Sequence, residues 1–320
     1  MERTMKLIIT GGSGFIGTNA VEHFSKHFEV INIDHQKPQI EEHMKYWRNV
    51  DLLDYHSLSK TIQDFNPDYI LHLAARTDLM GETLDDYSAN TIGVDNLLKA
   101  VKELKNLKKI LVTSSMLVCH VGYIPKDQFD YSATTLYGKS KVETEKLTWN
   151  ADLQCDWALL RPTSIWGPWF HEPYRNFFNM VKKRAYFHIG HKGCTKTYGY
   201  IGNSIYQIEH ILMADTNDRN NKVFFIGDRP AINITEWANQ IGNELGFRIP
   251  VMPWALIRMA AYFGDALKAV GIKFPMTSFR LKNMTTDNVI PLGNTYEVAP
   301  NPPFDRLAGI RKTLKWMENH

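Results

Sequence analysis

A tyrosine and a lysine four residues apart, Tyr137 and Lys141, are the pair in this sequence best suited to acid–base chemistry. At this spacing on a helix, the two side chains lie on one face, one turn apart. An ammonium group beside a phenol favours the phenolate and lowers a phenol pKa that is ordinarily about 10. Such a tyrosine can exchange a proton with a hydroxyl group at neutral pH. Of the 14 tyrosines, only Tyr137 is followed by lysine at the fourth position.

Two serines, Ser114 and Ser115, lie where a hydroxyl group could assist that tyrosine. They directly follow an apolar run at residues 110–113, which predicts a buried β-strand. Ligand sites of parallel sheets lie beyond the carboxyl ends of the strands, so a hydroxyl group here faces the ligand crevice. We expect Ser115 to hydrogen-bond the reacting oxygen; an ordinary polar strand end is the alternative interpretation.

A glycine-rich segment follows the first apolar run and opens the first predicted helix. Gly11 permits a tight turn, Gly14 lets the backbone approach a pyrophosphate, and Gly17 lets the helix pack closely on the strand. The amide groups and the dipole at the helix N-terminus then stabilise the phosphates. The segment therefore predicts a dinucleotide cofactor.

An aspartate at the end of the second predicted strand favours NAD over NADP. Asp34 lies 17 positions after Gly17, where a carboxylate accepts hydrogen bonds from the ribose hydroxyls and repels a 2′-phosphate. A capping role at the strand end is the alternative. Asp51 and Leu52 follow a third predicted strand, where an adenine amino group could be bound.

Short apolar runs alternate with predicted helices through the first half of the chain. Such alternation predicts an α/β fold, with a doubly wound parallel sheet of the Rossmann type covered on both faces. The predicted strands cover residues 7–9, 30–34, 69–73, 110–113 and 157–160, and the predicted helices cover residues 20–27, 58–65, 84–104 and 137–150.

The regular alternation fades after Arg161 and Pro162, which predicts a second, smaller unit. We expect an NAD-binding Rossmann domain at residues 1–166 and a substrate-binding lobe at residues 167–320. A helix at 205–216 and a strand at 223–226 indicate that residues 203–228 rejoin the first domain. A further helix at 235–245 is expected to begin with Thr235 as its N-cap.

Residues 253–270 form an unusually apolar predicted helix. It could lie on a membrane surface, as amphipathic helices do. Its polar face carries few cations, so a helix of the lobe or core is the favoured interpretation.

Composition excludes several classes of protein. A net charge of +3 and no basic run argue against a nucleic-acid partner. No window is long and apolar enough for a membrane span. The three cysteines fit no zinc module, so no metal is expected, and their odd number favours a reducing, cytoplasmic location.

Together these residues resemble the extended short-chain dehydrogenase/reductase family, and in particular its NAD-dependent nucleotide-sugar epimerase/dehydratase branch. The order and spacing of the motifs match over about the first 170 residues. The matching segments are residues 10–17, Asp34, Asp51 with Leu52, residues 72–75, Asn90 with Gly93, residues 113–115, Tyr137 with Lys141, and residues 161–168.

The resemblance implies a mechanism and a set of site residues. Hydride would pass between the nicotinamide and a sugar carbon, while Tyr137 moves the hydroxyl proton, Lys141 holds the ribose and Ser115 orients the oxygen. It also implies a homodimer formed through the helices near residues 90–104 and 137–150. The implied cofactor-binding residues are Gly11, Gly14, Phe15, Ile16, Gly17, Asp34, Asp51, Leu52, Leu73, Ala74, Ala75, Asn90, Thr113, Tyr137, Lys141 and Pro162.

The sequence also departs from the family pattern. Family dehydratases have Asp-Glu after the catalytic hydroxyl residue, whereas this chain has Met116 and Leu117, which cannot transfer a proton. Dehydration at C4 and C6 is therefore not expected. Ser164 replaces the usual asparagine, and Lys196 replaces an arginine that often grips the diphosphate. The candidate substrate contacts are Thr77, Asp78, Ser164, Asn176, Lys196 and Arg280.

Three functions remain open on the sequence. The leading hypothesis is an NAD-dependent epimerase or keto-reductase that acts on a nucleotide-activated sugar. The second is an NAD(P)-dependent reductase or dehydrogenase of a hydrophobic ketone, aldehyde or sterol-like alcohol, for which the eight tryptophans leave room. The third is a non-catalytic dinucleotide sensor.

Overall fold

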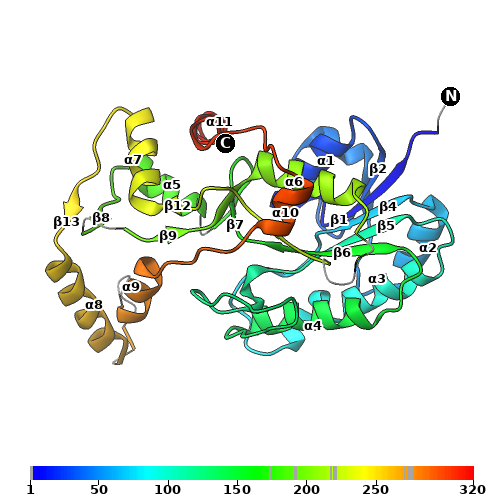
Figure 1. Ribbon diagram of the computed structural model, residues 1–320, viewed down its shortest axis with the longest axis horizontal. Helices are drawn as coiled ribbons and strands as arrows, with labels where there is room; N and C mark the ends of the chain where they lie inside the picture. The colour runs from blue at the N-terminus through cyan, green and yellow to red at the C-terminus, as the bar shows by residue number, and fades with distance from the viewer. Residues whose placement is uncertain are drawn as a thin grey trace.

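A seven-stranded parallel sheet forms the centre of the larger part of the molecule (Figure 1). The computed structural model describes residues 3–172, 174–190, 193–216, 218, 222–269, 271–272 and 277–320, apart from the side chains of residues 269, 279, 280 and 283. The strands run in the order β11-β6-β5-β4-β1-β2-β3. Their bounds are β1 Lys6–Thr10, β2 Glu29–Asp34, β3 Trp47–Asn49, β4 Tyr69–His72, β5 Lys109–Thr113, β6 Asp156–Pro162 and β11 Val223–Ile226.

Alternation along the strands sends side chains to two separate apolar layers. In β1, Leu7 and Ile9 join a cluster that includes Phe24, whereas Ile8 joins a cluster that includes Leu97. One layer lies under α1 and α6, and the other lies under α2, α3 and α4 (Figure 1). This is the expected doubly wound α/β fold, and the prediction of the fold class is confirmed. The helix bounds are α1 Phe15–Phe24, α2 Tyr55–Phe65, α3 Ile92–Lys102, α4 Leu136–Asn150 and α6 Ile201–Met213.

The prediction of a single helix over residues 84–104 is wrong. The structure has a short 3-10 helix, η2 (Asp85–Asn90), and then α3. Helical geometry is interrupted at Tyr87, with a φ of −107° and a ψ of 30°, and α3 begins after Thr91 as its N-cap. The side chain of Asn90 is bonded to the backbone N–H and carbonyl oxygen of Arg76, which holds η2 against the loop after β4.

Two predicted helix starts are also corrected. The first helix begins at Phe15 rather than residue 20, because the chain enters α1 directly from the glycine-rich turn. The helix α7 (Ile234–Glu244) is capped by Asn233 and not by Thr235. The Asn233 side chain accepts hydrogen bonds from the N–H groups of Thr235 and Glu236.

The rest of the chain forms a smaller lobe of short strand pairs and helices, at the left of Figure 1. The parallel pairs are β7 (Ser164–Trp166) with β10 (Tyr198–Tyr200) and β8 (His188–Ile189) with β13 (Val251–Met252). The antiparallel pair is β9 (Thr195–Lys196) with β12 (Ile232–Asn233). The lobe helices are α5 (Tyr174–Lys182), α7, α8 (Trp254–Ala269) and α9 (Ser278–Thr285).

Two helices near the C-terminus connect the lobe to the sheet. The helix α10 (Gly293–Val298) packs on β11 and α6, and α11 (Arg306–Asn319) packs on α7. The Thr295 hydroxyl donates to the Phe225 carbonyl oxygen of β11 at 2.7 Å. Among the helices of the described ranges, none is long and apolar enough to cross a membrane.

Candidate active site

The glycine-rich turn between β1 and α1 is tightly packed. Gly11 has a φ of +72°, and a Cβ there would lie 2.6 Å from the Ala74 backbone. A Cβ at Gly17 would lie 2.0 Å from the Gly11 carbonyl oxygen. At Gly14 the nearest atom would be 3.4 Å away, on the open side of the turn. Gly11 and Gly17 therefore let the backbone fold into a tight turn, a backbone cradle at the N-terminus of α1.

The N-terminus of α1 opens onto this cradle. Gly14 is the N-cap residue and supplies no side-chain cap to the first turn, so the N–H groups at Phe15 and Ile16 stay available for an anion. A pyrophosphate is the kind of group that such a turn binds. The residues present therefore fit the phosphates of NAD.

Asp34 lies at the end of β2, beside the same turn. Its carboxylate accepts from the Ser13 N–H at 3.1 Å and from the Gln36 N–H at 2.9 Å. These bonds hold the carboxylate at the position where the ribose is expected. Asp51 is exposed, and Leu52 is buried beneath Gly93 of α3.

The three residues expected to act on the substrate come together where β5 ends. Lys141 is 1% exposed, and its Nζ donates to the carbonyl oxygen of Thr113, the last residue of β5, at 2.9 Å. Tyr137 is 8% exposed and is hydrogen-bonded to Ser115. A Cβ at Gly138 would lie 2.2 Å from the Leu117 carbonyl oxygen, so this glycine lets α4 approach the short helix η3 (Met116–Val118) that follows Ser115.

The expected lowering of the Tyr137 pKa is not what the structure shows. Burial raises the pKa of Tyr137 to about 12, although its hydrogen bond with Ser115 acts in the opposite direction. Burial also lowers the pKa of Lys141 to about 7, against the opposing influence of Glu145. The spacing correctly placed both groups on one helix, but it carried no information on desolvation, which is the larger effect.

A buried ion pair between α4 and β6 lies behind these residues and holds the elements that carry them. Glu145 and Arg161 are both fully buried, with Arg161 donating to the two carboxylate oxygens at 2.8 and 2.7 Å. The Ser114 hydroxyl donates to the same carboxylate at 2.5 Å. This network connects α4, β5 and β6, and so fixes Ser115 and Tyr137 relative to each other.

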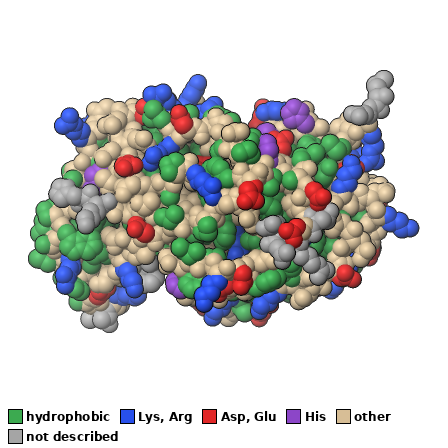
Figure 2. Space-filling view, viewed as in Figure 1, with side chains coloured by type: hydrophobic (Ala, Val, Ile, Leu, Met, Phe, Trp, Pro, Cys, Tyr) green, Lys and Arg blue, Asp and Glu red, His purple; other side chains and the backbone are tan. Residues whose placement is uncertain are grey.

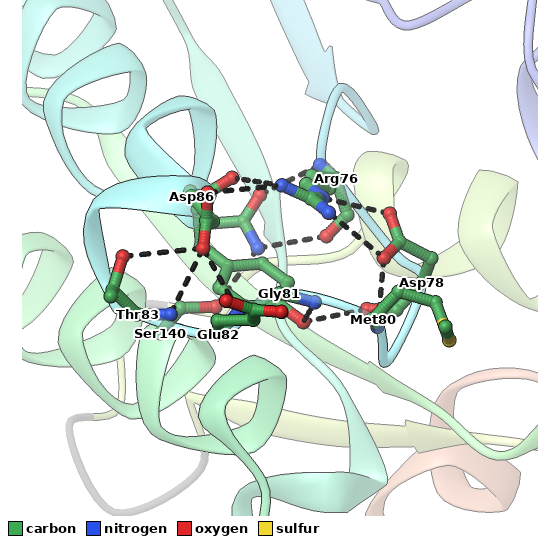
Figure 3. Close-up of polar contacts among 10 residues, drawn as sticks. Arg76, Asp78, Met80, Gly81, Glu82, Thr83, Asp86 and Ser140 are labelled. Carbon is green, nitrogen blue, oxygen red and sulfur yellow. Dashed lines mark hydrogen bonds and ion pairs between the residues drawn. The ribbon is translucent and has the colours of Figure 1, made fainter.

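Polar contacts hold the loop after β4 together and connect it to α4, as Figure 3 shows. Arg76 forms an ion pair with Asp78 at 2.8 Å and donates to the Asp86 carbonyl oxygen at 2.9 Å. Asn90 connects this loop to α4, because its amide group donates to the Ser140 hydroxyl at 2.9 Å. The Asp78 carboxylate is therefore already paired within its own loop.

The candidate substrate residues do not all come together. Thr77 and Asp78 are exposed on the loop after β4. Ser164 is buried in β7 and hydrogen-bonded to the Tyr174 hydroxyl, whereas Asn176 is exposed on α5. Lys196 is half-buried in β9, and the side chain of Arg280 lies outside the described part of the structure.

Of the remaining expected cofactor residues, Leu73, Ala74 and Ala75 follow β4. The N–H of Ala74 donates to the Thr10 hydroxyl at 3.3 Å, which holds this segment against the glycine turn. Pro162 is the last residue of β6, at the same edge of the sheet as Thr113.

Sequence reasoning missed several residues that shape the site. Glu145 had a usable signal, since it lies eight residues after Tyr137 and four after Lys141 on one helical face. Tyr174 is half-buried and lies close enough to Tyr137 to influence its pKa, and Asn288 accepts from the Gly122 N–H at 2.8 Å. These last two come from the smaller lobe, and no local pattern marks them.

Comparisons with known proteins agree with this architecture. Residues 7–199 match the model of the family described as "NAD dependent epimerase/dehydratase family". The N-acetyl-alpha-D-glucosaminyl-diphospho-ditrans,octacis-undecaprenol 4-epimerase of Escherichia coli O157:H7 is 25% identical over 97% of this chain and 94% of its own. A 3-beta-hydroxysteroid dehydrogenase of Mycolicibacterium neoaurum is 26% identical over 77% of this chain and 71% of its own.

A solved structure shows the same fold over nearly the whole length. It is the UDP-glucuronic acid 4-epimerase of Bacillus cereus in complex with NAD, with a TM-score of 0.77, 18% identity and coverage of 98% of this chain and 97% of that one. The expected family and its NAD dependence are thereby confirmed. The chain belongs to the NAD dependent epimerase/dehydratase family.

Proposed function

We propose that this protein is an epimerase or keto-reductase that acts on a nucleotide-activated sugar. The observation that carries the proposal is the meeting of Tyr137, Ser115 and Lys141 at the carboxyl end of β5, at the same edge of the sheet as the glycine turn after β1. Met116 and Leu117 follow Ser115 and offer no acid or base, which argues against dehydration.

Bound NAD supplies a ring that accepts or donates hydride. The chain itself supplies the proton chemistry: Tyr137 is protonated near neutral pH, so it is ready to donate a proton to a sugar ketone. Lys141 has a pKa of about 7, so it changes charge in the same pH range. We infer that the charged form of Lys141 favours the phenolate that takes the proton in the reverse direction.

Turnover on a panel of sugar nucleotides tests this proposal. Purified protein is offered UDP-, dTDP-, GDP- and CDP-sugars with NAD, and products are separated by chromatography. Tyr137→Phe is expected to abolish turnover while leaving NAD affinity unchanged, and Tyr55→Phe, on the exposed side of α2, is the matched control. Full activity of Tyr137→Phe would refute the assigned role. No turnover by the wild type on any sugar, with NAD bound, would favour a sensor.

A lipid-type alcohol or lipid-linked sugar is the second candidate substrate. The relatives matched over 97% and 77% of this chain are named for a sugar linked to undecaprenol and for a hydroxysteroid. Competition separates the two candidates. UDP should inhibit turnover if the site holds a nucleotide, and it should have no effect on a lipid substrate.

We also propose that different parts of the chain bind the cofactor and the substrate. Residues 1–166 with 203–228 would bind NAD, and the rest of residues 167–320 would bind the substrate. A homodimer through the helices near 90–104 and 137–150 remains the expected assembly, and light scattering that shows a monomer would contradict it. The three cysteines are free thiols in the structure, which supports a reducing compartment such as the cytoplasm.

A further inference from the structure

Only one side of the helix α8 packs against the rest of the lobe. Ile257 and Ala261 are buried against Leu281 of α9, in a small cluster that also includes Phe187 and Met252. This cluster is separate from the two large apolar layers that flank the central sheet. One side of α8 is therefore sufficient to attach it to the lobe.

The opposite side of α8 is also apolar, and it is exposed. Met259 is 66% exposed and Phe263 is 59% exposed, which is unusual for side chains of this size. The other large apolar residues exposed on α8 are Trp254, Leu256 and Tyr262. Figure 2 shows hydrophobic side chains gathered at the left end of the molecule, where α8 lies. An exposed group of large apolar side chains of this kind typically marks a surface that contacts a membrane or another protein.

In the described part of α8 and α9, the exposed charged side chains are all cations, and the one carboxylate of α8, Asp265, interacts with Lys268. Arg258 and Lys268 are exposed on α8, and Lys282 is exposed on α9. The acid of α8, Asp265, is half-buried and accepts a hydrogen bond from the Ser278 N–H at 3.1 Å. Among the described exposed residues of α8, none is acidic. Exposed cations of α8 and α9 therefore flank the aromatic and aliphatic side chains of the outer face.

We propose that the outer face of α8 binds an anionic lipid bilayer surface. Apolar and aromatic side chains enter the boundary of the acyl chains, while arginine and lysine remain at the headgroups. Anionic lipids attract each cation near the surface. The proposal rests on this face alone and is independent of the identity of the substrate.

A second copy of this chain fits the face less well. A two-fold symmetric contact places the same patch against itself. Arg258 and Lys268 would then meet the same cations of the other copy, with no exposed acid on α8 to neutralise them. An anionic lipid surface supplies the missing negative charge.

Vesicle sedimentation tests the proposal on the full-length protein. Wild type is expected to bind vesicles that contain phosphatidylglycerol, and to bind pure phosphatidylcholine vesicles much more weakly. The double variant Met259→Ser/Phe263→Ser should weaken binding by about tenfold or more, because two large apolar side chains no longer enter the bilayer. The control Met180→Ser/Met213→Ser changes exposed methionines of α5 and α6 and should leave binding unchanged.

A charge variant provides an independent measurement. Arg258→Gln/Lys268→Gln should weaken binding to the anionic vesicles by about thirtyfold, which corresponds to about 2 kcal/mol for the two cations together. Lys102→Gln/Lys105→Gln, which removes two exposed cations near the end of α3, should have no effect. The proposal is overturned if wild type does not bind anionic vesicles, if neither α8 variant weakens binding, or if the α8 variants instead dissociate an oligomer in sedimentation velocity.

Discussion

Removing the charge of Glu145 should lower the free energy of unfolding far more than a charge change at an exposed helical position would. Glu145 and Arg161 are fully buried and joined by two hydrogen bonds of 2.8 and 2.7 Å. Glu145→Gln leaves the guanidinium charged, since arginine keeps its proton in proteins. Breaking a buried pair in this way costs about 3–5 kcal/mol. The nearby exposed pair of Glu143 with Lys146 provides the control, because Glu143→Gln should cost less than about 1 kcal/mol.

Urea unfolding followed by circular dichroism measures both effects. Adding Arg161→Met to Glu145→Gln should recover part of the loss, because the unpaired charge is then gone. A double-mutant cycle should give a coupling energy of about 2 kcal/mol or more. If Glu145→Gln unfolds within about 1 kcal/mol of the wild type, or if the cycle shows no coupling, the pair is not what holds α4 against β6.

Three further outcomes follow from the geometry of the site. Gly17→Ala should lower the free energy of unfolding by about 1–3 kcal/mol and weaken NAD binding in calorimetry, because a Cβ would lie 2.0 Å from the Gly11 carbonyl oxygen, whereas Gly14→Ala, with 3.4 Å, should be milder. The pKa of Lys141 is about 7 in the folded state, against an ordinary value of 10.5. Between these two pH values the unfolded chain binds one more proton at this residue than the folded chain does. The free energy of unfolding of the wild type should therefore rise relative to that of Lys141→Met, by up to about 1.4 kcal/mol per pH unit, as the pH rises through that range. Equal pH slopes for the two proteins would contradict it. Asp34→Ala should weaken the affinity for NAD by about tenfold in a fluorescence titration, and should reduce the preference of the protein for NAD over NADP. An unchanged preference for NAD over NADP would show that Asp34 does not contact the ribose.

The sequence determined the fold class, the dinucleotide turn and the family, because each depends on local order. Glycines at 11, 14 and 17 directly after a strand specify a backbone turn within eight residues. The helical spacing of Tyr137 and Lys141 places them on one face without reference to any other element. Short apolar runs between helices likewise predict a parallel sheet without knowledge of its neighbours.

Only the tertiary structure decided the environment of those residues. Burial reverses the expected direction of the Tyr137 pKa, and burial is a property of all the surrounding elements. The interruption at Tyr87 between η2 and α3 likewise depends on the fold, where Asn90 is bonded to the backbone of Arg76 in the loop after β4. The sequence favoured a helix of the lobe or core at residues 253–270, and only the fold decides that one face of α8 is exposed. A one-dimensional pattern specifies which side chains share a face, but only the packing of distant segments decides what covers that face.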